Sequence, residues 1–181
     1  VTILFKNGKT AYLKKSQNQK KFDFLFEGGG PGSTFVMNKK FMINLKNNLK
    51  TNIKVAKKII FHDWYIYFFA RINRYKWFID NFSGLKYRQH EKNELGANVN
   101  FKTKLIRLKY ILSQNFFNQL KYFFLLNKDQ KKNYQFLFSM NKLNTFFFII
   151  KNFHSFRRKN TEKIACFFIL LIILIRRKKL V

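Results

Sequence analysis

Residues 38–60 read NKKFMINLKNNLKTNIKVAKKII, and this stretch decides the predicted fold. Its apolar residues recur at steps of three and four, while polar residues fill the opposite side, as in an amphipathic helix. The apolar set is Phe41, Leu45, Leu49, Ile53, Ala56 and Ile60, and the polar set includes Lys40, Asn47, Lys50, Lys54 and Lys58. The stretch predicts one long helix, and the chain around it is expected to be mainly α-helical.

Positive charge dominates the whole sequence. Lys and Arg number 37 against 8 Asp and Glu, which gives a formal net charge of +29 on 181 residues. No acidic residue stands between Glu27 and Asp63, so the polar side of the predicted helix is uniformly cationic. Soluble helices usually mix the two signs. A solvated face is the plain alternative, but the charge favours contact with the phosphates of RNA.

Further helical patterns fill most of the chain. They cover residues 64–81, 85–110 with a possible kink at Gly96, 114–126, 134–153 and 161–176, after a short helical turn around 11–19. Core candidates in the second of the long helices are Trp64, Phe68, Ile72 and Phe78 or Ile79. We predict an RNA-binding domain over residues 1–110 and a basic, aromatic-rich helical extension over 111–181.

The run GGGPGS at residues 28–33 contains four of the seven glycines and the only proline. Such a cluster marks a place where the backbone needs unusual freedom. We predict the tip of a β-hairpin or of a loop here, leading into a strand-like segment at 34–36. A nucleotide-binding P-loop is excluded because no Lys follows the glycines at the required position.

Catalytic and metal-binding motifs are absent from the sequence. His62-Asp63 and His90-Glu91 are adjacent pairs, and adjacent residues on a helix do not share a face. The single cysteine, Cys166, excludes an intrachain disulfide and is expected to be a small core residue. The sequence therefore predicts no enzyme, no cofactor and no metal site.

Residues 164–175 are apolar without interruption and are followed by four basic residues. A bilayer span needs about 20 apolar residues. A helix buried against protein is therefore favoured over a membrane anchor. The abundance of Lys, Asn, Ile and Phe, whose codons can be written with A and T alone, indicates an AT-rich genome and favours a mitochondrial location.

Three segments resemble the bacterial-type family of small-subunit ribosomal protein seven. Residues 1–9, VTILFKNGK, are similar to its first-helix signature, and Gly32-Ser33-Thr34-Phe35 is similar to its hairpin motif. His90, Glu94, Asn98 and Phe101 resemble a late helix of that family. The resemblance implies a helical bundle-like domain with a β-hairpin, and residues after about 110, the predicted helical C-terminal extension, have no counterpart in the family. It also implies a place in the head of the small subunit near the exit tRNA site.

On these grounds the sequence predicts a structural, rRNA-binding constituent of a mitochondrial ribosome in the matrix. Its partners would be ribosomal RNA, neighbouring ribosomal proteins, and as further candidates tRNA and mRNA. Two alternatives stay open, an accessory subunit of a mitochondrial inner-membrane complex and another divergent ribosomal protein. The candidate RNA-binding residues are Lys6, Lys9, Ser33, Thr34, Phe35, Lys39, Lys40, Lys46, Lys50, Lys54, Lys57, Lys58, Arg71, Arg74, Lys86, Arg88, Lys102 and Lys104.

Overall fold

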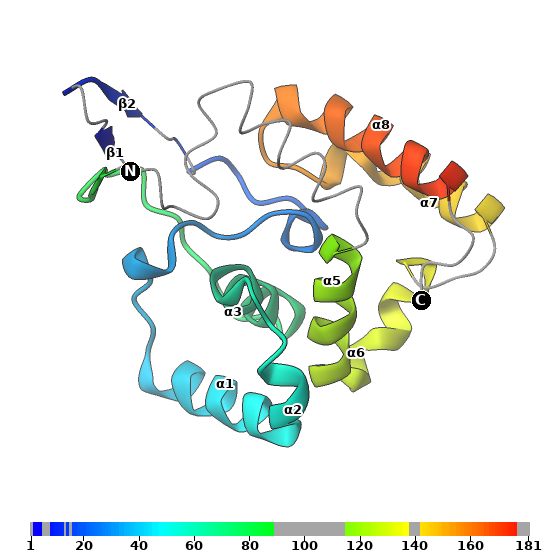
Figure 1. Cartoon of the computed structure of the whole chain (residues 1–181), viewed down its shortest axis with the longest axis horizontal. Coiled ribbons are helices and arrows are strands. Elements are labelled where there is room, and N and C mark those ends of the chain that lie inside the picture. Colours follow the sequence, from blue (N-terminus) through cyan, green and yellow to red (C-terminus); the bar gives the residue numbers. More distant parts are fainter. Residues whose placement is uncertain are drawn as a thin grey trace.

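The computed structural model describes residues 2–4, 8–12, 14, 16–88, 115–137 and 142–176. Helices dominate these ranges, which confirms the mainly α-helical class (Figure 1). The helices are α1 (Lys39–Thr51), α2 (Ile53–Ala56), α3 (His62–Ile72), α5 (Asn115–Leu126), α6 (Lys128–Lys131), α7 (Lys142–Asn152) and α8 (Asn160–Arg176). Four 3₁₀ turns cover Asp23–Leu25, Gly32–Thr34, Lys132–Leu137 and Phe153–Ser155.

A small three-stranded sheet lies at one end of the molecule. Strand β1 (Thr2–Leu4) is central, antiparallel to β2 (Thr10–Tyr12) and parallel to β3 (Lys86–Arg88). The buried side chain of Ile3 holds the sheet to the interior. Three predictions are therefore wrong. The helix expected over 85–110 begins with strand β3, and its remainder from 89, including the kink at Gly96, lies outside the described residues. The first-helix signature over residues 1–9 contains a strand, and so does the start of the helical turn expected around 11–19.

The predicted helix over residues 38–60 is broken at Asn52. Asn38 caps the start of α1 by accepting a hydrogen bond from the Phe41 N–H at 2.8 Å. Asn52 caps α2 in the same way, accepting from the Val55 N–H at 3.2 Å, and its own backbone is not helical. The break turns part of the predicted inner face outward, because Ile53 is 56% exposed and Ile60 59%.

The glycine run does not form the predicted hairpin. Gly32–Thr34 is a 3₁₀ turn closed by the Phe35 N–H, which donates to the Gly32 carbonyl at 3.0 Å. Residues 35–38 then run into α1 without joining the sheet. The hairpin and the strand at 34–36 were wrong because these glycines serve close packing rather than a strand reversal, as the site below shows.

Helix α3 is the centre of the hydrophobic core (Figure 1). Trp64 stacks on Phe116 of α5 with ring centroids 4.8 Å apart, and Phe68 contacts Phe123 at 5.2 Å. The helix ends at Ile72 instead of 81 because Arg74 adopts a left-handed backbone with φ of 60°. Trp64, Phe68 and Ile72 are buried as predicted, but Phe78 is 86% exposed.

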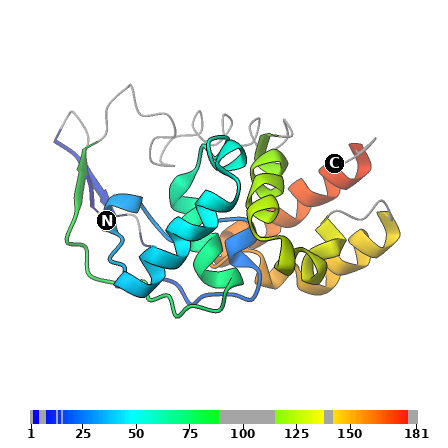
Figure 2. The same ribbon diagram turned by 90° about the horizontal axis from the view of Figure 1, so that it is seen from below.

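Helices α7 and α8 pack side by side, and α5 separates them from α1 and α2 in both views (Figures 1 and 2). Leu170 and Leu174 of α8 are buried, whereas Phe168 is 57% exposed. Cys166 is half-buried against the core. No helix in the described part of the chain has both the length and the apolar run to cross a bilayer. The expected burial of α8 therefore holds for one face only.

Candidate active site

The glycine run lies directly over the start of α3. A Cβ added at Gly29 would fall 2.9 Å from the indole of Trp77, and one at Gly32 would fall 2.2 Å from Oδ1 of Asp63. A Cβ added at Gly28 would lie 3.6 Å from the Cα of Trp64, an ordinary van der Waals contact. Side chains larger than hydrogen cannot fit at Gly29 and Gly32 without displacing the loop, so the glycines permit close approach to α3.

Asp63 stands in the first turn of α3 beneath Gly32. Its Oδ1 is shielded from solvent and accepts no hydrogen bond from the described residues. His62 Nε2 lies 2.7 Å from this oxygen, an ion-pair contact when the imidazole is protonated but not an aligned hydrogen bond. The expectation that His62 and Asp63 point apart is therefore wrong. The helix N-terminus also favours a negative charge here.

Four charged residues form what we call the buried ion cluster, made of Asp23, Glu27, Arg71 and Arg158. Arg71 Nη1 donates to Asp23 Oδ1 at 2.9 Å, and Arg158 Nη2 donates to Glu27 Oε2 at 3.1 Å. The Arg158 Nε lies 3.8 Å from Asp23 Oδ2. Two acids face two arginines, so the cluster is balanced in charge when all four are ionised.

The buried ion cluster fixes the chain that leads into the glycine run. Arg158 Nη2 donates to the Gly28 carbonyl at 2.6 Å, and its backbone N–H donates to Glu27 Oε1 at 2.7 Å. Arg157 Nη1 reaches the Phe26 carbonyl at 2.7 Å. The segment just before α8 therefore clamps residues 26–28, and through them the glycine loop over Asp63.

Burial sets the protonation of the cluster. It raises the pKa of Asp23 above the ordinary 3.8, against the opposing effect of Arg71, the Lys20 N–H and Arg158. Burial also raises the pKa of Tyr67, so its phenol keeps the proton that it donates to Asp23 Oδ2 at 3.0 Å. The guanidinium of Arg158 lies over the Tyr67 ring, 5.5 Å from its centroid.

The acids of the buried ion cluster and Asp63 differ in their hydrogen-bond partners. Every member of the buried ion cluster is engaged with another charged group, so that cluster holds structure. Asp63 Oδ1 is a buried carboxylate oxygen without a hydrogen-bond donor among the described residues, which sets it apart from the paired carboxylates of the cluster. Among the described residues, no three His, Cys, Asp or Glu side chains are grouped to hold a metal ion.

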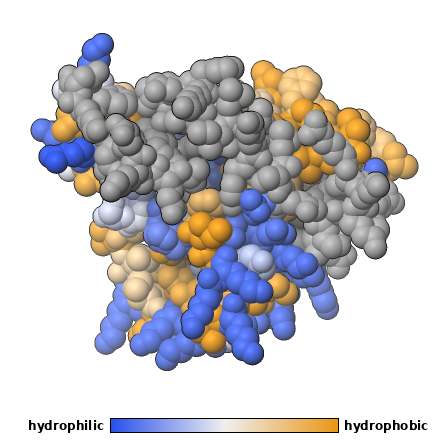
Figure 3. All heavy atoms as spheres, in the orientation of Figure 1, coloured by the Kyte–Doolittle hydropathy of each residue, from blue (hydrophilic) through white to orange (hydrophobic). Residues whose placement is uncertain are grey.

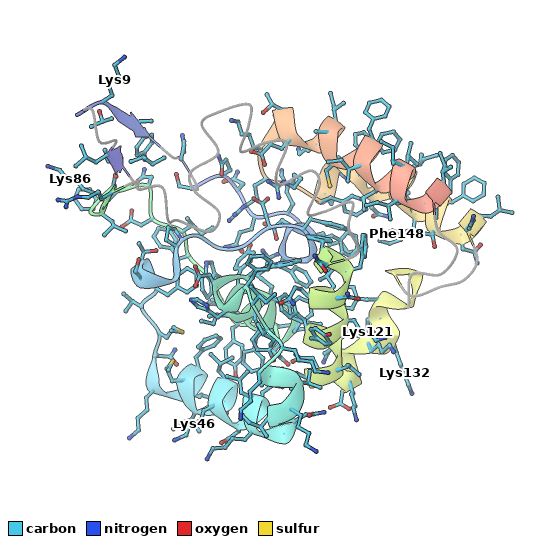
Figure 4. The ribbon with its side chains drawn as sticks, viewed as in Figure 1. Lys9, Lys46, Lys86, Lys121, Lys132 and Phe148 are labelled. Atoms are coloured by element: carbon cyan, nitrogen blue, oxygen red, sulfur yellow. The ribbon has the colours of Figure 1, made fainter. Side chains whose placement is uncertain are left out.

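The predicted RNA-binding residues do not converge on one surface. Lys9 and Lys86 lie beside the sheet, at the end of the molecule away from Lys46 on α1 (Figure 4). Arg71 is committed to Asp23, while Arg74 and Arg88 are exposed. Lys39, Lys40, Lys46, Lys50, Lys54, Lys57 and Lys58 are all exposed on or next to α1 and α2. Lys6, Lys102 and Lys104 lie outside the described residues, as do His90, Glu94, Asn98 and Phe101.

The residues expected at a hairpin tip are part of the glycine loop. Ser33 and Thr34 are exposed, and the Thr34 hydroxyl donates to the Pro31 carbonyl at 2.7 Å. Phe35 packs edge-on against Trp77 with centroids 4.9 Å apart. These contacts stabilise the 3₁₀ turn above Asp63.

Sequence reasoning missed Asp63, Asp23 and Arg158 as residues that build a site. One signal could have found the acids. The chain has only 8 acidic residues among 181, in a composition strongly biased toward Lys, so each acid stands out. An acid that is buried or faces a glycine cluster under that bias points to a specific local role.

Comparison with known proteins gives one informative similarity. Over 108 residues, 60% of this chain, the sequence is 42% identical to the dTDP-rhamnosyl transferase RfbG of Shigella flexneri. The chain spans 37% of the length of that curated relative. No protein-family model matches the sequence. No solved structure matches it either.

This similarity overturns the ribosomal interpretation. The matched protein is named as a sugar transferase and not as a member of the ribosomal protein seven family, so the predicted family, its rRNA, tRNA, mRNA and ribosomal-protein partners and its role in translation are wrong. The prediction of a chain without enzymatic activity is wrong for the same reason. The relative is bacterial, which contradicts the mitochondrial location, and nothing found supports an inner-membrane complex or another ribosomal protein. An AT-rich composition reports on base bias and cannot identify an organelle.

Proposed function

We propose that this chain is part of a glycosyltransferase and that Asp63 is its catalytic base. The observation that carries the proposal is the Oδ1 of Asp63, held out of solvent beneath Gly32 without a hydrogen-bond donor from the described residues. The similarity to a dTDP-rhamnosyl transferase supplies the reaction class. The proposed donor is dTDP-rhamnose and the proposed acceptor is a hydroxyl group of a saccharide.

The reaction needs one proton acceptor. The acceptor oxygen forms a bond to the anomeric carbon of the donor sugar, and the bond from that carbon to the phosphate oxygen breaks. Nucleoside diphosphate leaves with the bonding electron pair, and the acceptor hydroxyl must lose its proton. Asp63 takes that proton, which increases the nucleophilicity of the attacking oxygen.

The surroundings of Asp63 suit this role. The glycine loop packs directly against the carboxylate, which is possible only because Gly32 carries no Cβ. The buried ion cluster holds that loop from beneath through the Gly28 carbonyl. The His62 side chain, which is 79% exposed, contacts Asp63 Oδ1 through its Nε2 at 2.7 Å.

The finer fold belongs to the same proposal. We take residues 1–110 to form a helical bundle-like domain that carries Asp63, and residues 111–181 to form a helical extension. The core contains side chains from both sides of residue 110, such as Trp64 and Phe116. The extension supplies Arg158 to the buried ion cluster and so supports the site.

The test replaces Asp63 by Asn, which keeps the shape of the side chain and removes its basicity. The purified chain is incubated with dTDP-rhamnose and a panel of saccharide acceptors, and release of dTDP is measured. We expect a loss of about 100-fold or more for Asp63→Asn, since general-base catalysis contributes about 10²–10⁴-fold. Asp129→Asn, on the exposed surface of α6, is the matched control and should retain full activity.

Binding is followed separately by tryptophan fluorescence. The only two tryptophans, Trp64 and Trp77, lie against Gly28 and Gly29, so a ligand at the loop should change their emission. Asp63→Asn should bind dTDP-rhamnose like the wild type while turning it over slowly. Full activity in Asp63→Asn refutes the base assignment. If the wild type shows no turnover and no change in fluorescence, the transferase assignment is refuted.

A further inference from the structure

The surface formed by α1 and α2 combines two features that rarely occur together. Seven lysines, which we call the lysine face, are exposed there, and four large apolar side chains are exposed among them. Met42 is 44% exposed, Ile43 47%, Ile53 56% and Ile60 59%. Figure 3 shows blue side chains interspersed with orange over this part of the molecule. The members of the lysine face are Lys39, Lys40, Lys46, Lys50, Lys54, Lys57 and Lys58.

The spacing places an apolar residue within the cationic stripe. Lys39, Ile43, Lys46 and Lys50 follow one another at steps of three and four, so they share one side of α1. That side is opposite to the buried Phe41 and Leu45. Single exposed apolar residues are ordinary. Here four of them lie in a region of 23 residues that contains no acid, which is a pattern rather than an isolated residue.

We propose that the lysine face rests on the surface of an anionic lipid bilayer, with Ile43 and Ile53 entering the headgroup boundary. Lysine ammonium groups are attracted to anionic headgroups, and their aliphatic stems can lie along the apolar boundary. Transfer of the Ile43 and Ile53 side chains from water to that boundary lowers the free energy. This proposal does not depend on the transferase reaction or on Asp63.

A nucleic acid is the other polyanion that a lysine face could bind, and the details favour the bilayer. No arginine occurs between residues 28 and 62, although arginine is the residue that best combines phosphate contact with stacking on bases. The one phenylalanine within α1, Phe41, is buried and unavailable for stacking. A phosphate backbone offers exposed isoleucines no apolar surface to pack against, whereas the boundary of a lipid bilayer does.

The first experiment measures co-sedimentation of the 181-residue chain with vesicles. One set contains equal parts of phosphatidylglycerol and phosphatidylcholine, and the other contains phosphatidylcholine alone. We expect binding to the anionic set only. Three changes on the lysine face, Lys46→Gln, Lys50→Gln and Lys54→Gln, should together lower the affinity about 100-fold, since each lysine near such a surface contributes about fivefold.

The matched control removes the same charge elsewhere. Lys128→Gln, Lys132→Gln and Lys142→Gln are exposed changes on α6, the turn after it and α7. This triple variant should lose less than about fivefold, the share of one lysine. Equal losses in the two triple variants mean that total charge alone drives binding, and they overturn the proposal.

The second experiment tests the apolar contribution. The double variant Ile43→Ser and Ile53→Ser keeps every lysine. At about 1 M salt, charges are screened beyond about 3 Å. A loss of binding to anionic vesicles in this variant that persists at that salt concentration assigns the contact to lipid. Binding unchanged by these two substitutions overturns the insertion. Polyuridine is then added as a competitor. The bilayer proposal is overturned in favour of nucleic acid if polyuridine releases the chain from vesicles only when the isoleucines are intact. It is also overturned if the chain binds polyuridine more tightly than vesicles at equal phosphate concentration.

Discussion

Charged residues are buried and paired in the buried ion cluster, whereas those of the lysine face are exposed and lie in a stretch of sequence without acids. In the cluster, Arg71 and Arg158 are matched with Asp23 and Glu27 inside the protein. On the lysine face, seven exposed lysines stand in a stretch with no acid between residues 28 and 62, and the ammonium of Lys58 lies over the Tyr122 ring at 5.7 Å. Buried charges must be paired because desolvation is costly, whereas exposed ones need not be. The comparison teaches that Asp23 and Glu27 serve the interior, and that the charge of the lysine face, unpaired among the described residues, is a surface property.

The residue types differ for the same reason. Arginine carries several donors on one planar group, and Arg158 donates from its Nη2 to both Glu27 Oε2 and the Gly28 carbonyl. Lysine is a strongly hydrated point charge that suits an open surface. Composition alone cannot separate the two populations. Their separation appears only when the residues are placed in the fold.

Removal of Arg158 tests this comparison most severely. Arg158→Met should lower the free energy of unfolding by about 3–5 kcal/mol, because a buried partner is lost and Glu27 and Asp23 are left without compensation. Urea denaturation followed by tryptophan fluorescence measures the loss. Lys159→Met changes an exposed neighbour and should shift the stability by less than about 0.5 kcal/mol. Equal effects of the two variants contradict a structural role for the cluster.

Gly32→Ala tests the loop that the cluster supports. The new Cβ would stand 2.2 Å from Asp63 Oδ1, so either the loop or the carboxylate must move. We expect a loss of about 1–3 kcal/mol in stability, as for overpacking elsewhere, together with a marked fall in dTDP release. Gly84→Ala is the control, since its Cβ meets only the ring of the exposed Phe82 at 3.1 Å. Unchanged activity in Gly32→Ala would mean that the loop does not govern Asp63.

Local patterns predicted much of this fold. Amphipathic periodicity located the starts of α1, α3, α5 and α8 to within a few residues, whereas the helix expected from residue 134 begins only at Lys142, as α7. The errors lie where one residue overrides the pattern. Asn52 caps a new helix in the middle of the predicted one, and the left-handed Arg74 ends α3 early.

The site was harder to predict than the helices. Asp63 and Gly32 are 31 positions apart in the chain, and nothing local indicates that one covers the other. Arg158 and Glu27 are 131 positions apart. Such pairs are set by how α3, α8 and the N-terminal segment pack together, which periodicity does not encode. The glycine run was recognised as special, but close approach was mistaken for a turn of a hairpin.

The acidity of Asp23 gives a pH-dependent test of the interior. Burial raises its pKa in the folded state above the ordinary 3.8, so the folded protein keeps this proton to a higher pH than the unfolded chain. The resulting stabilisation is complete below that ordinary value and is lost as the pH rises through the folded pKa. The wild type should therefore lose stability relative to Asp23→Asn across this window.

Urea midpoints taken at a series of acidic pH values measure that difference. Asp129→Asn serves as the control, because Asp129 is exposed on α6 and should show no such trend. A wild type that instead gains stability relative to Asp23→Asn as the pH rises would show that Arg71 and Arg158 outweigh burial at Asp23.

The smallest effect on stability is expected on the lysine face. The triple change Lys46→Gln, Lys50→Gln and Lys54→Gln removes three exposed ammonium groups with no ion pair to break, so the free energy of unfolding should change by less than about 0.5 kcal/mol for each. Relief of repulsion between Lys46 and Lys50, four positions apart on α1, gives a slight gain at low salt that fades as salt is added. Thermal unfolding at low and high salt measures both effects. A large loss would mean that these lysines support the fold itself, and the contrast with Arg158 would disappear.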